Sequence, residues 1–284
     1  MSRAAILTAA VALLALAAAP ARADQWNKVY KVTARPDVHV ETNDAAIEVS
    51  AGDANEVAVR VLTSGYDISS SGVQIERDVQ TGNRIEIAVR VPRVSWSWGV
   101  TNRSVHIELT VPRTSNLDLH SGDGHIRASG VTGDLQMETR DGSIEVSDLR
   151  GSVRLHSGDG HIEGSAMDGS LDASTNDGHI RVRGRFDALR LESGDGSVTA
   201  EVLPDSKLTN NWSIHTGDGS VTVRLADGLS ADIDAHTGDG SISSQLPLMV
   251  SGIIGRTDLH GKLGGGGPSF QIRTGDGSIR LERM

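Results

Sequence analysis

The stretch "HSGDGHI" occupies His120 to Ile126 and returns unchanged at His156 to Ile162. Its central Asp recurs at four successive steps of equal length, and then at three longer steps of unequal length. A fixed period of this kind is typical of a chain built from repeated structural units. The eight aspartates, called the Asp row below, are Asp123, Asp141, Asp159, Asp177, Asp195, Asp218, Asp239 and Asp276.

Alignment of the eight copies on this Asp shows which neighbouring positions are constant. Ser or Thr always stands two residues before the Asp, and Ile or Val always stands three residues after it. Further apolar residues lie at even distances before the Asp and at odd distances after it, with polar residues between them. This period of two is typical of strands with one buried face. Each copy therefore predicts two short strands joined at a Gly-rich corner.

A ninth, degenerate copy precedes these eight. The segment "VHVETNDAAIEV" starts at Val38 and places Asp44 at the repeat position, with Ala45 instead of the second Gly. Between it and Asp123 lie the alternating runs "EVAVRVL", "GVQIERD", "RIEIAVRVP" and "SVHIELTVP", which predict antiparallel strands inserted into or packed beside the first coil. We expect a continuous all-β body with an N-terminal β region over residues 24–112 and a repeat region over residues 113–284.

A repeat unit of two strands could stack as one coil of a solenoid or run as part of a meander of hairpins. In a solenoid, each residue lies about 4.8 Å above its counterpart in the previous coil, so like stacks on like. The constant Ile/Val and Ser/Thr columns favour the solenoid. The predicted fold class is all-β, namely a single-stranded, β-helix-like β-solenoid with 18-residue coils plus extra antiparallel strands in the N-terminal part.

Two stretches carry a resemblance to a known family. The segment "IELTVPRTSNLDLHSGDGHIRASGVTGDLQMETRDGSI", which starts at Ile107, resembles the bacterial DUF4097 family, whose members are called "putative adhesins". The final "GKLGGGGPSFQIRTGDGSIRLERM", which starts at Gly261, resembles it too. The resemblance covers the chain from about Val38 to the end and implies a right-handed β-helix-like solenoid. It implies no established activity and no catalytic residues.

The first residues have the pattern of a signal peptide. Arg3 precedes the apolar run "AAILTAAVALLALAAAP", and "ARA" at Ala21 to Ala23 is a signal-peptidase pattern. We expect residues 1–23 to be removed and the chain to reach the periplasm or the cell surface. The run is shorter than the roughly 20 apolar residues of a membrane span. Cleavage removes two arginines and changes the formal net charge from -10 to -12, which disfavours binding to nucleic acid.

Repeated Gly and Asp residues are typical of calcium-binding β-rolls, so calcium binding is one candidate function of the Asp row. Calcium-binding β-rolls repeat about every nine residues, whereas this motif repeats every 18. One carboxylate per coil is few for the roughly six to eight oxygen ligands of calcium. We therefore predict a structural turn motif, in which each carboxylate accepts backbone N–H groups of its own turn and the flanking glycines adopt positive φ. The inward Ser or Thr hydroxyl can bond a corner amide or the next hydroxyl.

Histidines at matching repeat positions raise the question of a metal site. They are His120, His125, His156 and His161. The coil between them carries Glu138 and Ser143 at those positions, so a full layer separates the two pairs. We expect outward, solvated histidines without the convergence that zinc requires, and we predict neither a metal site nor a cofactor.

The predicted function is that of an exported, non-enzymatic β-solenoid protein with a structural or adhesin-like role at the cell envelope. An envelope component or a glycan is the partner considered, with no membrane span after cleavage. The alternatives are a carbohydrate-binding or carbohydrate-active β-helix protein and a calcium-stabilised repeat protein. Mixed charges at the outward positions argue against an enzyme. Trp96 and Trp98 share one strand face, which predicts packing against the solenoid or, if exposed, stacking on a sugar.

Overall fold

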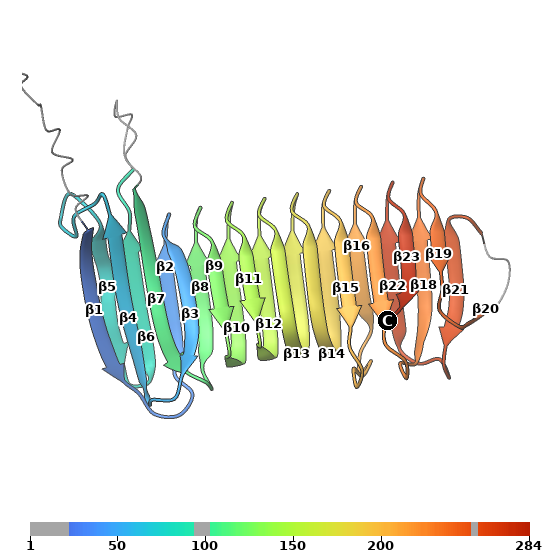
Figure 1. Ribbon diagram of the computed structural model, residues 1–284, viewed down its shortest axis with the longest axis horizontal. Helices are drawn as coiled ribbons and strands as arrows, with labels where there is room; N and C mark the ends of the chain where they lie inside the picture. Colours follow the sequence, from blue (N-terminus) through green and yellow to red (C-terminus); the bar gives the residue numbers. More distant parts are fainter. Residues whose placement is uncertain (1–22, 94–102, 251–254) are drawn as a thin grey trace, which may run out of the picture.

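The computed structural model describes residues 23–93, 103–250 and 255–284, and these ranges contain 23 strands. Figure 1 shows the strands side by side in one elongated stack. The predicted all-β class is therefore confirmed. Within the same ranges, no helix is long and apolar enough to cross a membrane. The predicted signal peptide, Ala23 apart, and the pair Trp96 and Trp98 lie outside the described residues.

The strands that precede the repeat corners lie in one parallel ladder and those that follow them lie in a second, and each ladder also contains one of the inserted N-terminal strands. The first ladder contains β2 (Asp37–Thr42), β6 (Arg84–Arg90), β8 (Asn116–Ser121), β10 (Thr132–Thr139), β12 (Arg150–Ser157), β16 (Trp212–Thr216), β18 (Ala231–Thr237) and β22 (Ser269–Thr274). The second contains β3 (Ala46–Gly52), β7 (Ser104–Pro112), β9 (Ile126–Ser129), β11 (Ile144–Ser147), β15 (Val198–Val202), β17 (Val221–Leu225), β19 (Ile242–Ser244) and β23 (Ile279–Arg283).

Seven strands complete the sheet. The long strands β13 (Ile162–Thr175) and β14 (Ile180–Ser193) take part in both ladders. The remaining five pair antiparallel at the two ends of the stack and are β1 (Ala23–Lys31), β4 (Glu56–Ser64), β5 (Gln74–Thr81), β20 (Leu248–Val250) and β21 (Asp258–Leu263).

The register of the ladders places like residues beside like. Ile144 pairs with Ile126 on one side and with Ile162 on the other, which is a shift of one repeat period in each direction. All three are fully buried. Leu119 and Leu155, which share another inward position of the repeat, are also fully buried. Small aliphatic side chains therefore fill the space between the two ladders. Toward the C-terminal end, Trp212 and Phe270 add an edge-to-face aromatic pair with ring centroids 5.5 Å apart.

At the N-terminal end, units far apart in the sequence lie side by side. The degenerate copy, β2 and β3, pairs directly with β8 and β9. On their other edges, β2 and β3 pair in parallel with β6 and β7, which in turn pair antiparallel with β5 and β4. The predicted antiparallel strands are confirmed, while the parallel pairing of β6 and β7 was not predicted from their sequence.

At the C-terminal end, the spatial order of the units differs from their order in the chain. Strand β22 lies between β16 and β18, and β23 lies between β17 and β19 (Figure 1). The expectation that each unit stacks on the preceding one is therefore wrong for the unit of β18 and β19, which pairs with the last unit instead of with β16 and β17. The reason is that β21 pairs antiparallel with one edge of β18, which leaves its other edge for β22.

Candidate functional site

The Asp row lies at exposed bends between the two ladders. Neighbouring corners are joined by backbone hydrogen bonds, such as the one from the amide of Asp159 to the carbonyl of Arg140 at 3.0 Å. Among the described residues, no carboxylate of the Asp row accepts a hydrogen bond from a backbone N–H. Asp123 and Asp141 instead receive the guanidinium of Arg140. The predicted hydrogen bonds from the backbone amides of the turn to these carboxylates are therefore not found in the described part of the chain.

The buried hydroxyl two residues before each Asp holds the corner instead. The Thr175 hydroxyl lies 3.0 Å from the carbonyl oxygens of both Gly158 and Gly160, to which it donates, and it accepts the amide of Gly178 at 3.3 Å. The equivalent hydroxyls of the other copies also donate to carbonyl oxygens of the adjacent corner. The donors are Ser121, Thr139, Ser157, Ser193, Thr216, Thr237 and Thr274. Because the hydroxyls are buried, water does not compete for their hydrogen bonds. The exposed carboxylates of the Asp row remain solvated by water instead.

Thr175→Val is expected to destabilise the protein, because valine keeps the shape of threonine but leaves buried carbonyl and amide groups without their partner. The loss should be about 1 to 3 kcal/mol, measured by urea unfolding. The matched control is Asp177→Asn at the exposed corner next to it, which should change stability by less than about 0.5 kcal/mol. A larger loss in the Asp177 variant than in the Thr175 variant would show that the carboxylate holds the turn after all.

The glycines beside each Asp serve a different purpose from the predicted one. Positive φ occurs at glycines of the opposite corners, such as Gly151 at 109° and Gly169 at 126°, and not at those flanking the Asp row. The flanking glycines are required because the corner backbones stack directly on one another. A Cβ atom on Gly160, for example, would lie 2.0 Å from the carbonyl oxygen of Gly142.

The Asp row lacks the convergence that calcium needs. Within the described residues, the only group of three or more metal-ligating side chains with mutually close ligand atoms lies elsewhere, at His39, Asp118 and His120. The midpoint of thermal unfolding is therefore expected to agree within about 2 °C between millimolar calcium and EDTA. An increase of many degrees in calcium would show that calcium binds to the folded protein.

The four histidines singled out by the repeat have different surroundings. His161 stacks on His179 with ring centroids 4.9 Å apart, and His156 Nδ1 lies 2.9 Å from the hydroxyl of Ser174. Burial lowers the pKa of His125. His120 departs from the expectation of a solvated histidine, because the adjacent strand β2 brings a second histidine beside it.

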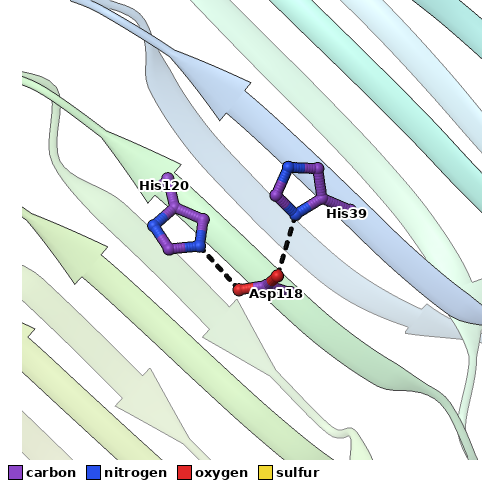
Figure 2. Close-up of side chains that lie close together, drawn as sticks. All are labelled: His39, Asp118 and His120. Carbon is purple, nitrogen blue, oxygen red and sulfur yellow. Dashed lines mark hydrogen bonds and ion pairs between the residues drawn. The ribbon is translucent and has the colours of Figure 1, made fainter.

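His39, Asp118 and His120 form a compact group, called the His–Asp–His cluster below. His39 Nδ1 lies 2.9 Å from one oxygen of Asp118, and His120 Nε2 lies 2.7 Å from the other. Figure 2 shows the two rings on either side of the carboxylate. Burial disfavours ionisation of Asp118, but the two histidine hydrogen bonds outweigh it and hold the pKa of Asp118 below its usual value. The cluster is half-buried on the outer face of the first ladder.

The surroundings of the cluster are polar. His120 Nδ1 lies 3.5 Å from an oxygen of Glu138, which comes from β10. A shallow groove of about 360 Å³ begins at His39 and Asp118 and continues over β10 and β12 to Arg154. Two imidazole nitrogens and a carboxylate are a donor set suited to a divalent transition metal.

The sequence contained a signal for this cluster. His39 stands five residues before Asp44, and Asp118 stands five residues before Asp123. Stacking of the degenerate copy directly on the Asp123 copy would have placed them side by side. Because a long insertion separates the two copies in the sequence, the contact between His39 and Asp118 is not evident from the order of the residues.

A second groove, of about 570 Å³, lies over the second ladder. Its charged side chains are paired between neighbouring strands, as in Arg127 with Glu145 at 2.9 Å, Arg181 with Glu163 at 3.0 Å and Arg183 with Glu201 at 3.6 Å. The hydrogen bond from Arg127 holds the pKa of Glu145 below its usual value. Beside this charged row run the serines Ser129, Ser147 and Ser165.

The stacked ladders, the hydroxyl column and the Gly-rich corners define an elongated all-β repeat protein. The family profile described as Toastrack DUF4097 matches residues 36–282. The chain therefore belongs to the DUF4097 family, as the resemblance of its repeats indicated.

Several solved structures are similar to this chain. A "putative cell adhesion protein" from Clostridium sporogenes is 12% identical, with a TM-score of 0.31, over 93% of this chain and 100% of that one. A "putative adhesin" from Bacteroides fragilis is 10% identical, with a TM-score of 0.43, over 92% and 97%. A "putative lipid binding protein" from Parabacteroides distasonis is 14% identical, with a TM-score of 0.42, over 92% and 97%. At these sequence identities and TM-scores, no ligand or role of these proteins is transferred to this chain. No curated protein matches it.

Proposed function

We propose that this chain is an exported, non-enzymatic β-solenoid protein with a structural or adhesin-like role at the cell envelope. The parallel register from β8 to β13, in which each strand is shifted by one repeat period, supports successive coils of a solenoid. In such a rod, each outward position of the repeat becomes a row of side chains about 4.8 Å apart. Rows of this kind suit contact with an extended partner better than enclosure of a small substrate.

The observation that carries the non-enzymatic assignment is the pairing of charges in the groove over the second ladder. A general acid needs a carboxyl group whose pKa is raised toward neutrality. Glu145 instead accepts two hydrogen bonds from Arg127, which lowers its pKa. Glu163 is likewise held by Arg181 at 3.0 Å. Carboxylates held by arginines are poor proton donors.

Carbohydrate binding without cleavage is the second candidate function. The groove offers serine hydroxyls, guanidinium groups and carboxylates in parallel rows, and these groups form hydrogen bonds with sugar hydroxyls. The alternating charges along the groove fit a neutral or zwitterionic glycan better than a strongly anionic one.

A glycan array combined with a turnover assay tests both candidates. Binding without release of new reducing ends supports the proposal, and Arg181→Ala should weaken that binding. Arg113→Ala is the matched control, because Arg113 pairs with Asp53 away from the groove. Polysaccharide cleavage that ceases in Glu145→Gln would overturn the non-enzymatic assignment.

Export is tested by cell fractionation with mass spectrometry of the N-terminus. We expect the mature chain to begin at Asp24, which already lies in β1 and whose backbone N–H donates to the Thr63 hydroxyl at 3.2 Å. Ala23→Asp should block cleavage and leave the precursor with the membrane fraction. Recovery of the uncleaved precursor from the cytoplasm of wild-type cells would contradict export.

A further inference from the structure

We propose that the His–Asp–His cluster binds one divalent first-row transition-metal ion, of which Zn²⁺ is the probe used below. His39 Nδ1, a carboxylate oxygen of Asp118 and His120 Nε2 are the three ligand atoms. This site goes beyond the proposed scaffold role and does not depend on it.

The geometry of the cluster is close to what a tetrahedral ion requires. The candidate ligand atoms all lie within 4.8 Å of one another. Zinc bonds to nitrogen and oxygen are about 2.0 to 2.1 Å long, which places tetrahedral ligand atoms about 3.4 Å apart. The side chains of His39, Asp118 and His120 are 21%, 46% and 30% exposed, which leaves them room to rotate toward that spacing. Both imidazole nitrogens already point toward the carboxylate that they would share with the ion (Figure 2).

Groups outside the three ligands also fit a metal site. Glu138 lies 3.5 Å from Nδ1 of His120 and can accept a hydrogen bond from it, which leaves Nε2 free to bind the ion. Glu41 stands opposite His120 in the register of β2 and β8 and adds negative charge. Arg84, which lines the adjoining groove, is held by Glu86 at 2.8 Å. The local charge therefore favours a cation.

The donor set distinguishes among cations. Calcium and magnesium take oxygen ligands, whereas two imidazoles and one carboxylate suit zinc and its neighbours in the first row. Three protein ligands leave the fourth tetrahedral position for water or for a group of a partner.

The same repeat position elsewhere in the stack does not build such a site, and it supplies a matched control. His156 corresponds to His120, but Arg154 stands where Asp118 stands in the cluster. The partner of His156 is the hydroxyl of Ser174 at 2.9 Å. A site that depended only on outward histidines would therefore lose as much affinity in His156→Ala as in His120→Ala.

Bound metal would also join two parts of the chain. His39 and Asp118 are 79 residues apart and belong to β2 and β8, where the N-terminal strands meet the repeats. A ligand that binds only the folded state raises the midpoint of thermal unfolding. Zinc is therefore expected to stabilise the wild-type protein.

The test uses the untagged mature protein after removal of metals with EDTA and dialysis. Calorimetric titration with Zn²⁺ should give one ion per chain. His39→Ala and His120→Ala should each weaken binding by at least the roughly tenfold that loss of a hydrogen-bond partner of a ligand causes. His156→Ala should bind as the wild type does. Co²⁺ should give a visible absorption band in the wild type and in His156→Ala, but not in His39→Ala.

Thermal unfolding in EDTA shows whether the variants fold, and Asp118→Asn replaces any alanine variant that does not. The proposal fails if the wild type shows no saturable Zn²⁺ binding up to millimolar concentration. It also fails if the double variant His39→Ala/His120→Ala keeps wild-type affinity, or if His156→Ala loses as much as His120→Ala.

Discussion

Ile144→Asp is expected to unfold the protein. Ile144 is fully buried and pairs with Ile126 and Ile162 in the column between the two ladders. The variant removes a large apolar side chain from the core and places there a carboxylate without a partner. The combined loss should exceed about 4 kcal/mol, which approaches the whole stability of a domain at the lower end of the typical range of roughly 5 to 15 kcal/mol. Far-UV circular dichroism and urea unfolding measure the effect.

Glu145→Lys, one residue further along β11, is the matched control. Glu145 points outward, with its side chain 39% exposed and paired with Arg127 at 2.9 Å. The sequence predicts a nearly silent substitution, and the ion pair changes that expectation to a loss of up to about 1 kcal/mol. Equal losses in the two variants would contradict the assignment of buried and exposed positions along β11.

Gly160→Ala is expected to have the second-largest effect. The added Cβ atom would lie 2.0 Å from the carbonyl oxygen of Gly142, 2.5 Å from its carbon and 2.9 Å from the nitrogen of Ser143. These are backbone atoms of the adjacent corner, so no side-chain rotation relieves the clash. The two units must separate locally, which strains the hydrogen bonds of the Ser157 hydroxyl. We expect a loss of about 3 kcal/mol, measured by urea unfolding.

Gly265→Ala is the control for the loss of a glycine as such. No atom lies within 4 Å of a Cβ placed on Gly265, and its φ is not in the left-handed region. This variant should be within about 0.5 kcal/mol of the wild type or slightly more stable, because alanine restricts the unfolded chain. A small loss in Gly160→Ala would mean that the corners do not stack in direct backbone contact.

Much of the fold could be predicted because the relevant signals are local. Alternation around each Asp assigned the buried faces correctly, as the full burial of Ile126, Ile144 and Ile162 shows. The constant hydroxyl also pointed to a corner hydrogen bond, which Thr175 makes. The predicted hydrogen bonds of the Asp carboxylates are not found among the described residues, because sequence does not show whether a corner carboxylate turns inward to its amides or outward to water.

The candidate site could not be predicted to the same degree. His120 was identified, but its partners His39 and Asp118 became neighbours only through the pairing of β2 with β8. Local sequence patterns do not show that the inserted strands are skipped in space, so they do not show that His39 lies beside Asp118.

The sequence by itself determined the family, the two-strand repeat, its buried columns and its Gly-rich corners, because each depends on residues within one period or on the steric limit of a glycine. Only the tertiary structure decided which units lie side by side. Strand β22 inserts between β16 and β18, and β2 lies against β8, because strands pair through backbone groups that are the same in every unit. The final order therefore depends on which strand edges remain free after β21 and the N-terminal strands have paired, and this order brings His39 to Asp118.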